Sequence, residues 1–445
     1  MTRTNQERVL WLAVVLVALT TIVGILLAPR GRSGSNSEGP HSDAAHLTLA
    51  ELEALLEPRI PGIETIASRV ESIAPDLMTF CGPVSRGVLG ASDGPSIDFF
   101  KGIPRESIDT TRRYLDPRLP ILLRLDSLVG LPPGRYSIMY SVPLAQQPKE
   151  SQRMIASMMI LWRLLDTYAA MCIVDGDMES AAWAARICLL IVEPLRNEPS
   201  AGAWLNRIQA AEIGINILEN VLRVGAPSDS SLVEMDTLLR RLLESAPDSL
   251  VMAMRGELAG TVETRAALPF TTRLLIPDRS RAAVARAIDE LAAAAGDYAA
   301  LREASRRMSQ LAAGATSAPF TVGSLATSMP NIVSLHIRAT GTFSVARTAI
   351  AIERCTRETG QPPGDWDDLI PTYIEARPVD PFGSGGPHWK ACDDGLIVHV
   401  GTVSPRQDDP CAAWNAEKPP REGSLFRWVK SEKRRLVILD APADD

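Results

Sequence analysis

The feature that most constrains this chain is a long apolar stretch close to its N-terminus. Residues Val9 to Ala28 form a run of 20 residues without a charged side chain. A helix rises about 1.5 Å per residue, so a helix of this length spans the roughly 30 Å hydrocarbon core of a bilayer. We therefore expect one transmembrane helix at residues 9–28, preceded by a short tail at residues 1–8.

A cleaved signal peptide is the alternative interpretation of this stretch. Signal peptides have a shorter apolar core and end in small residues at the cleavage site. If cleavage followed Ala28, Leu26 would occupy the third position before the cut and Pro29 would come directly after it. These residues disfavour cleavage, so we expect an uncleaved signal-anchor.

The arginines that flank the apolar stretch leave its orientation open. Arg3 and Arg8 precede it, and Arg30 and Arg32 follow it, so the positive-inside count is a tie. We favour a cytoplasmic N-terminus, because the opposite orientation requires the charged tail to cross the membrane. The large body would then lie outside the cytoplasm, a compartment that suits a chain with six cysteines.

The composition of the chain is that of a folded globular protein. Its 445 residues are 46% hydrophobic and 22% charged, which are ordinary values, and the length suits two or three domains of roughly 150 residues. The net charge is −7 and aromatic residues make up 5%. These values disfavour a nucleic-acid-binding protein, which usually has a basic surface and aromatic side chains for stacking.

A helical body is expected at residues 47–313, after a flexible linker rich in glycine and serine at residues 29–46. Thr48 and Glu51 have capping-box spacing at its start. Apolar residues at helical spacing then predict several helices, the last of them running from Ser280 to Ala313. The earlier helices are expected at residues 154–174, 178–195, 203–222 and 231–246.

Short connections between these helices predict antiparallel neighbours in an α-helical bundle or solenoid-like body. The turn Asp175-Gly176-Asp177 joins the first two, and Ser231 with Glu234 has capping-box spacing in the fourth. The hairpin at this turn resembles the helix–turn–helix of tetratricopeptide-type repeats, but no second copy follows at a fixed period. Apolar residues at helical spacing ordinarily face the core. The core candidates are Met158, Met159, Trp162, Trp183 and Trp204.

Two stretches interrupt this helical pattern. Residues 81–143 are rich in glycine and proline, and loops, short strands and an interrupted helical hairpin all remain open there. Residues 314–330 combine small residues with prolines. We expect the second stretch to be a linker between the helical body and the C-terminal segment.

The C-terminal segment changes to an α+β pattern, expected as a small domain at residues 331–430 with a charged tail at residues 431–445. One long helix should end near Gly360, which suits a helix C-cap. Asp365 should then cap a short helix that ends before Pro371. Short strands are expected at residues 388–392, 396–401 and 424–429, and they predict a small antiparallel sheet.

Apolar residues in this segment predict a core of its own. Alternate strand residues share one face, so the sheet should pack against the long helix. We expect a piece starting near Ser328 to fold by itself, and Phe382→Ala to cost about 3 kcal/mol if Phe382 is buried. The expected core residues are Val345, Ile350, Ile352, Leu396, Val398, Val400, Leu425 and Trp428, with Pro381 and Phe382 closing one end.

The segment also carries a recognisable series of motifs. A helix ends in a Thr-Gly turn, a loop with the sequence DPFG follows, and a small sheet ends in a loop with paired aspartates. The matching positions are Thr359, Gly360, Pro363, Leu369, Pro371, Tyr373, Pro378, Asp380, Pro381, Phe382, Gly383, Gly395, Gly401, Asp408 and Asp409. In these residues the segment resembles the globular half of type II secretion pseudopilins. It resembles more closely a group of uncharacterised bacterial membrane-anchored proteins with such a segment at the C-terminus.

This resemblance covers about a fifth of the chain, which is too little to describe the whole fold. In pseudopilins the membrane helix continues directly into the globular half and carries a glutamate just after a processing site. Here the apolar stretch contains no acidic residue and lies roughly three hundred residues upstream of the segment. The resemblance therefore implies a related fold in a bacterial cell envelope protein, and it does not imply secretion activity.

Pseudopilin domains can bind calcium in the last loop of the sheet, so the resemblance implies a calcium site at Asp408 and Asp409. Calcium requires about six to eight oxygen ligands. Pro410 stands where the resemblance leads one to expect glycine, and Arg406 adds a positive charge. A solvated acidic loop is therefore the alternative, and no other cofactor is expected.

Cysteine spacing does not predict a zinc site, because the chain contains no pair in a C-x-x-C arrangement. Cys172 and Cys188 lie on the apolar hairpin and should be buried free thiols. Cys392 and Cys411 flank an expected strand and could form a disulfide outside the cytoplasm, although sequence does not establish the Cβ geometry. The five histidines lie in no metal or nucleophile motif.

Two functions remain open from the sequence. The first is a non-enzymatic scaffold or interaction protein of the cell envelope, held in the inner membrane by Val9–Ala28 and acting through protein contacts. The second is an envelope enzyme with an unrecognised active site in the helical body. The chain contains no G-x-S-x-G, Walker or dinucleotide-binding motif, which favours the first. A pocket lined by converging polar groups with shifted pKa values would favour the second.

Overall fold

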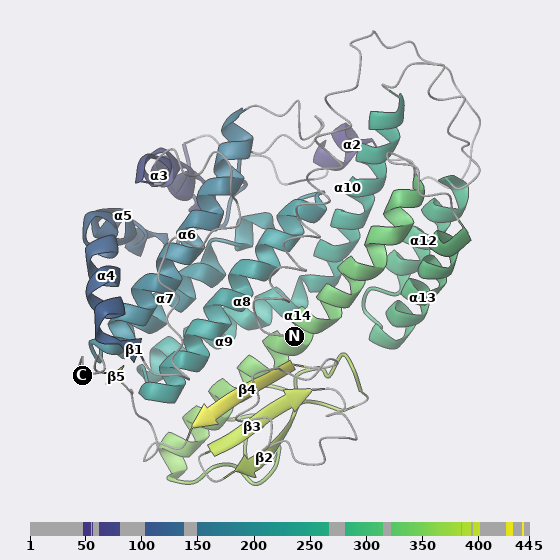
Figure 1. The fold of residues 1–445 in the computed structure, drawn as a ribbon. Coiled ribbons are helices and arrows are strands. Elements are labelled where there is room, and N and C mark those ends of the chain that lie inside the picture. Colours follow the sequence, from purple (N-terminus) through teal and green to yellow (C-terminus); the bar gives the residue numbers. More distant parts are fainter. Residues whose placement is uncertain are drawn as a thin grey trace, which may run out of the picture.

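The computed structural model describes residues 48–54, 56, 62–80, 103–137, 149–266, 281–314, 322–383, 385–392, 395–400, 424–429 and 438–439. Within these residues the chain is mainly helical and carries a small three-stranded antiparallel sheet (Figure 1). The mainly helical fold expected from the sequence is therefore confirmed. The expected transmembrane helix and the linker after it lie outside the described residues.

Of the first four described helices, α3 (Ile66–Phe80), α4 (Arg105–Leu115) and α5 (Leu119–Leu123) lie at one side of the molecule, whereas α2 (Leu49–Ala54) packs against α10 (Ala246–Ala266) (Figure 1). The expected capping box at α2 is confirmed: the Thr48 N–H donates to Glu51 Oε2 at 2.7 Å, and the Glu51 N–H donates to Thr48 Oγ1 at 3.1 Å. Helices α4 and α5 lie in the glycine- and proline-rich stretch at residues 81–143, for which the sequence did not decide between loops, short strands and an interrupted helical hairpin. A parallel bridge joins β1 (Ile103–Pro104) to β5 (Ile438–Leu439).

A bundle of longer helices forms the centre of the molecule, where α6 to α9 lie side by side (Figure 1). The turn predicted between α6 and α7 is present. Gly176 has a positive φ of 78°, which glycine adopts without strain, and the Asp177 side chain caps α7 by accepting from the Ser180 N–H at 3.0 Å. The helices are α6 (Lys149–Val174), α7 (Met178–Leu190), α8 (Ala201–Val224), α9 (Asp229–Glu244) and α10 (Ala246–Ala266), with a 3-10 helix η4 (Glu193–Leu195) between α7 and α8.

The N-cap predicted for α9 is wrong. Ser228 caps the helix by accepting from the Ser231 N–H at 3.3 Å, so α9 begins about one turn earlier than expected. The cause is a contact distant in sequence: the Glu179 carboxylate binds the Ser228 N–H and accepts from Ser231 Oγ at 2.8 Å. Glu234, expected in the capping box, instead pairs with Arg186 on α7.

The single helix expected from Ser280 to Ala313 is in fact two helices, α12 (Arg281–Ala293) and α13 (Tyr298–Gly314). The Asp297 side chain accepts from the N–H groups of Ala299 and Ala300 and so starts a new helix. Aspartate competes for backbone N–H groups in this way and favours N-caps over helix interiors. Alanines lie on both sides of Asp297 and continue the apolar pattern, so the pattern alone does not indicate the break.

Helix α14 (Val322–Thr359) is 38 residues long and connects the two ends of the fold. It packs against α8, α9, α10, α12 and α13, and also against the sheet, which lies along its C-terminal half (Figure 1). It begins inside the stretch expected to be a linker, so only residues 315–321 separate it from α13. It ends as predicted, and Gly360 after it has a positive φ of 76°.

The small sheet contains β2 (His388–Cys392), β3 (Gly395–Val400) and β4 (Ser424–Val429), in the spatial order β2-β3-β4 and antiparallel throughout. β2 and β4 have the predicted bounds, and β3 begins one residue earlier than predicted. The expected core residues Leu396, Val398 and Val400 of β3 are buried. They share one face because alternate residues of a strand point the same way.

The outcome for the other expected residues of this region is mixed. Leu425 and Trp428 were expected in the core, but their side chains lie outside what the structure describes. Val398 pairs with Phe426, and Phe426 is 1% exposed and joins the main core. The short helix expected after Asp365 is absent, because residues 364–373 form turns. There the Asp368 carboxylate accepts from the Gly364 N–H at 2.7 Å.

One hydrophobic cluster runs through the molecule, from Ile66 on α3 to Phe426 on β4. It includes most of the core candidates named from the sequence, and Phe382 is half-buried against it. Among the described residues, one helical segment, Ala156–Val174 of α6, is long and apolar enough to cross a membrane. Most of that segment is buried in the body, and α6 contacts α3, α4, α7 and α8, as a core helix does.

Candidate functional site

The residues of the expected calcium site, Asp408 and Asp409, lie outside the described residues. The DPFG loop upstream of them is described, and its aspartate has a structural role. Asp380 is 5% exposed and accepts from the Phe382 N–H at 2.8 Å, which holds the turn. Among the described residues, no group of three or more histidine, cysteine, aspartate and glutamate side chains is arranged to hold a metal ion.

The cysteines separate into two groups. Cys172, Cys188 and Cys355 are buried free thiols, which confirms the prediction for the first two. Cys392 is disulfide-bonded, and its partner lies outside the described part of the chain. The sequence has two further cysteines, Cys81 and Cys411, so a bond between Cys392 and Cys411 stays a prediction.

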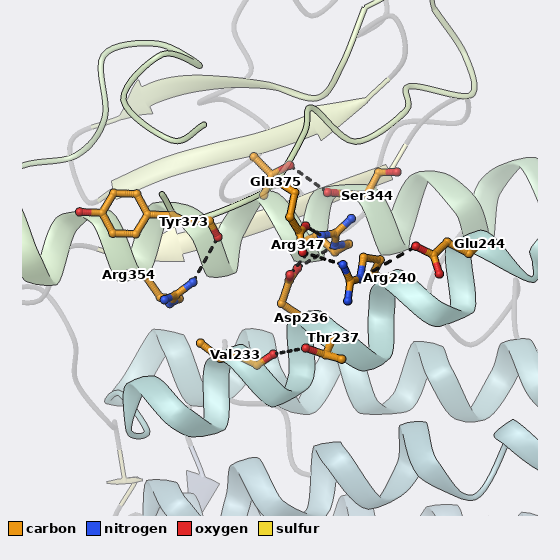
Figure 2. Close-up of polar contacts among 11 residues, drawn as sticks. Val233, Asp236, Thr237, Arg240, Glu244, Ser344, Arg347, Arg354, Tyr373 and Glu375 are labelled. Atoms are coloured by element: carbon orange, nitrogen blue, oxygen red, sulfur yellow. Dashed lines mark hydrogen bonds and ion pairs between the residues drawn. The ribbon is translucent and has the colours of Figure 1, made fainter. Parts of the chain in front are cut away.

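A group of ion pairs joins α9, α14 and the loop after α14 (Figure 2). We call its residues, Asp236, Arg240, Arg347 and Glu375, the α9–α14 clamp. Arg347 on α14 donates through Nε and Nη2 to the two carboxylate oxygens of Asp236 on α9, at 2.7 and 3.0 Å. Glu375 accepts from Arg347 Nη2 at 3.1 Å and from Arg240 Nη1 at 2.7 Å. The clamp thus links three segments of the chain with two arginines and two carboxylates.

The clamp has a buried half and an exposed half. The Arg347 side chain is 8% exposed and that of Asp236 is 13% exposed, whereas Arg240 and Glu375 are 39% and 60% exposed. Burial alone would lower the pKa of Arg347, but its hydrogen bonds and charge contacts with Asp236 and Glu375 outweigh that effect and raise it. A two-point arginine–carboxylate pair fixes orientation as well as distance.

Further contacts continue this attachment toward the C-terminal end of α14. Arg354 donates to Asp229 at 2.7 Å and to the Tyr373 carbonyl at 3.2 Å. Arg357 donates to the Pro227 carbonyl at 2.5 Å. Arg347 and Arg354 are seven residues apart and therefore share one helix face, as does Arg357. This face of α14 is fixed to α9 and to the residues just before it.

A second arrangement lies deeper, where η4, α8 and α14 meet, and we call Glu193, Arg207 and His336 the buried polar cluster. The three residues are 6%, 4% and 1% exposed. Arg207 donates to Ser245 Oγ at 2.5 Å. Glu193 and His336 both lie within electrostatic reach of Arg207. Charged groups are rarely buried to this extent unless they are paired or functional.

Burial shifts the pKa values of the residues in this cluster. The His336 ring stacks on Tyr298 with 6.1 Å between ring centroids and lies 6.4 Å from the Trp204 ring. Burial, and to a lesser extent the charge of Arg207, lowers the pKa of His336 to about 4. Burial also lowers the pKa of Arg207 to about 10 and raises that of Glu193. At neutral pH the histidine is therefore uncharged.

The sequence interpretation missed the residues of both arrangements. The available signal was a charged residue inside an apolar helix face. Arg207 follows Trp204 by three residues, and Arg347 stands among Val345, Ala346 and Ile350. Such a position requires a partner, but the sequence does not say which residue supplies it.

In comparisons with known proteins, no protein family, no curated protein and no solved structure matches this chain.

Proposed function

We propose that this protein is a non-enzymatic, membrane-anchored scaffold of the bacterial cell envelope that acts through protein contacts. Val9–Ala28 would hold it in the inner membrane, and the body would lie on the periplasmic side. The observation that carries the proposal is the α9–α14 clamp. A buried two-point ion pair fixes orientation, and here it holds the sheet-bearing end of α14 against the helical body. The two parts then offer partners a surface of constant geometry.

The disulfide at Cys392 supports the compartment. Disulfides persist in oxidising environments such as the bacterial periplasm and are rare in the cytosol. The pseudopilin-like motifs around the DPFG loop support an envelope protein in the same way. Protease added to intact spheroplasts should digest the body from the linker onward. Full protection until lysis would reverse the proposed orientation.

Photo-crosslinking in intact cells tests the scaffold role of the full-length chain. A crosslinkable residue would replace exposed positions across the body, including Leu123, which is 71% exposed, and Val379, which is 41% exposed. The buried Ile350 position is the control. We expect discrete adducts with another protein from exposed positions and none from Ile350. Exposed positions that give no more adduct than Ile350 would contradict the scaffold role.

The buried polar cluster favours a second candidate, an enzyme whose site lies in the helical body. Its three groups have shifted pKa values, as catalytic groups often do. Two variants distinguish the candidates in a deletion strain: Arg347→Met, which opens the clamp, and Glu193→Gln, which keeps the shape of the cluster but removes its acid. A scaffold requires the clamp, so Arg347→Met should fail to restore the wild-type phenotype while Glu193→Gln restores it. An enzyme predicts the reverse.

A further inference from the structure

Each residue of the buried polar cluster has a side-chain atom without a hydrogen-bond partner among the described residues. These atoms are Oε1 of Glu193, Nε of Arg207 and Nε2 of His336. Each belongs to a residue that is less than a tenth exposed. Buried polar atoms in folded proteins nearly always bond to protein or to ordered water. The cluster therefore requires a partner from outside the side chains that surround it.

The chemistry of the three atoms selects that partner. The Arg207 Nε–H can only donate, an ionised Glu193 oxygen can only accept, and His336 Nε2 does one or the other according to its tautomer. A cation would face the charge of Arg207 and of two further arginines near Glu193, Arg196 and Arg241, and an anion would face the Glu193 carboxylate. A neutral molecule that both donates and accepts suits all three atoms, and water is the smallest such molecule.

The position of the cluster agrees with this choice. Glu193 lies on η4 and Arg207 on α8, the next element along the chain, whereas His336 lies on the distant α14, and each residue has one unpaired atom. Glu193 and His336 both lie within electrostatic reach of Arg207. Together the three residues supply the number of polar partners that a buried water needs, normally about two to four. A direct pair between Glu193 and Arg207 is not formed: Arg207 bonds to Ser245, and Glu193 Oε1 remains unpaired.

We propose that the buried polar cluster is an internal water site, in which ordered water bridges Glu193 and Arg207 and reaches His336. The water joins η4 and α8 to α14 through hydrogen bonds, beside the ring contacts that His336 makes with Trp204 and Tyr298. It belongs to the folded structure and is not a substrate, so the proposal stands whether or not the chain is a scaffold.

A high-resolution experimental structure of the full-length protein in detergent tests the site. We expect a water within about 3.2 Å of both Arg207 Nε and Glu193 Oε1. A direct bond between these two atoms with no water between them would overturn the proposal. So would an ion or an organic molecule in that position.

Two variants sharpen the test. The double change Glu193→Leu with Arg207→Leu removes the principal partners, so the water should be lost from its structure. His336→Leu is the matched control, because it leaves Glu193 and Arg207 in place and should retain the bridging water. A water that persists in the double variant, or one that disappears in the control, would contradict the assignment. If the double variant does not fold, the wild-type structure and the control still decide.

Discussion

His336 shows how a single residue in this core can make stability depend on pH. The ring is 1% exposed and contacts the rings of Trp204 and Tyr298, with the charge of Arg207 nearby. Both the burial and this charge disfavour the imidazolium form. The unfolded chain has no such penalty, because its histidine is in water.

Acid should therefore destabilise the protein through His336. Its folded pKa of about 4 lies below the ordinary value of 6.5, so below pH 6.5 the unfolded state binds a proton that the folded state does not. This contribution is absent above pH 6.5 and should reach about 3 kcal/mol at pH 4. In His336→Leu, the loss of stability between pH 7 and pH 4 should be smaller by that amount, measured by urea unfolding. An equal loss in wild type and variant would contradict the shifted pKa.

The clamp allows a comparison of two arginines that differ in burial. Arg347→Met leaves the mostly buried Asp236 without its partner and should cost about 3 kcal/mol. Arg306→Met is the matched control, because Arg306 pairs with Glu303 at 2.6 Å but both side chains are about half exposed. Exposed pairs contribute less than about 1 kcal/mol. Similar losses in chemical unfolding of the two variants would mean that the clamp contributes no more than a surface pair.

At the scale of whole elements, helix α10 comes close to the segment before α8. A Cβ atom built at Gly256 would collide with the backbone carbonyl of Pro199, whereas one built at Gly296 would meet no atom within 4 Å. A backbone carbonyl cannot move aside as a flexible side chain does. Gly256→Ala should therefore cost roughly 1–3 kcal/mol, as overpacking usually does. Gly296→Ala, the control, should lie within about 0.5 kcal/mol of wild type in thermal unfolding.

The elements that the sequence predicted correctly are those set by local patterns. Strand β3 follows from a short apolar run, and the ends of α6 and α14 follow from apolar spacing and the glycines at 176 and 360. The errors have two causes. The start of α9 depends on a distant contact, from Glu179 of α7. The break before α13 is local and rests on one aspartate, Asp297, whose signal is weak in an alanine-rich run. The clamp forms only because α9 packs against α14. This is a tertiary contact, and the spacing of residues along the chain does not predict it.

On the scale of the whole molecule, the central question is whether the C-terminal segment is a separate domain. The sequence suggests a separable piece from about Ser328 onward. The observed packing favours the opposite result: α14 shares one core with the helical body, and its buried residues face α8 and α13 as well as the sheet. We therefore expect the isolated piece from Ser328 to the C-terminus to melt without a cooperative transition by circular dichroism. A cooperative transition would instead show that the C-terminal segment folds as a separate domain.

Phe382 tests the same packing from the sheet side. It is half-buried against the main cluster, so Phe382→Ala should cost less than the roughly 3 kcal/mol expected for a buried phenylalanine. Phe426→Ala, at a position 1% exposed, should cost about that full amount. Chemical unfolding of the two full-length variants gives the comparison. The reverse order would mean that the DPFG loop closes the core more tightly than β4 does.

Hydrogen exchange by mass spectrometry on the full-length protein tests the unity of the body most directly. If the clamp and the shared core make one cooperative unit, the amides of β3 and those of α9 exchange with the same opening free energy, and Arg347→Met lowers both values together. If β3 opens separately at lower free energy, and Arg347→Met leaves α9 unchanged, the sheet and the helical body are independent units and the account is wrong.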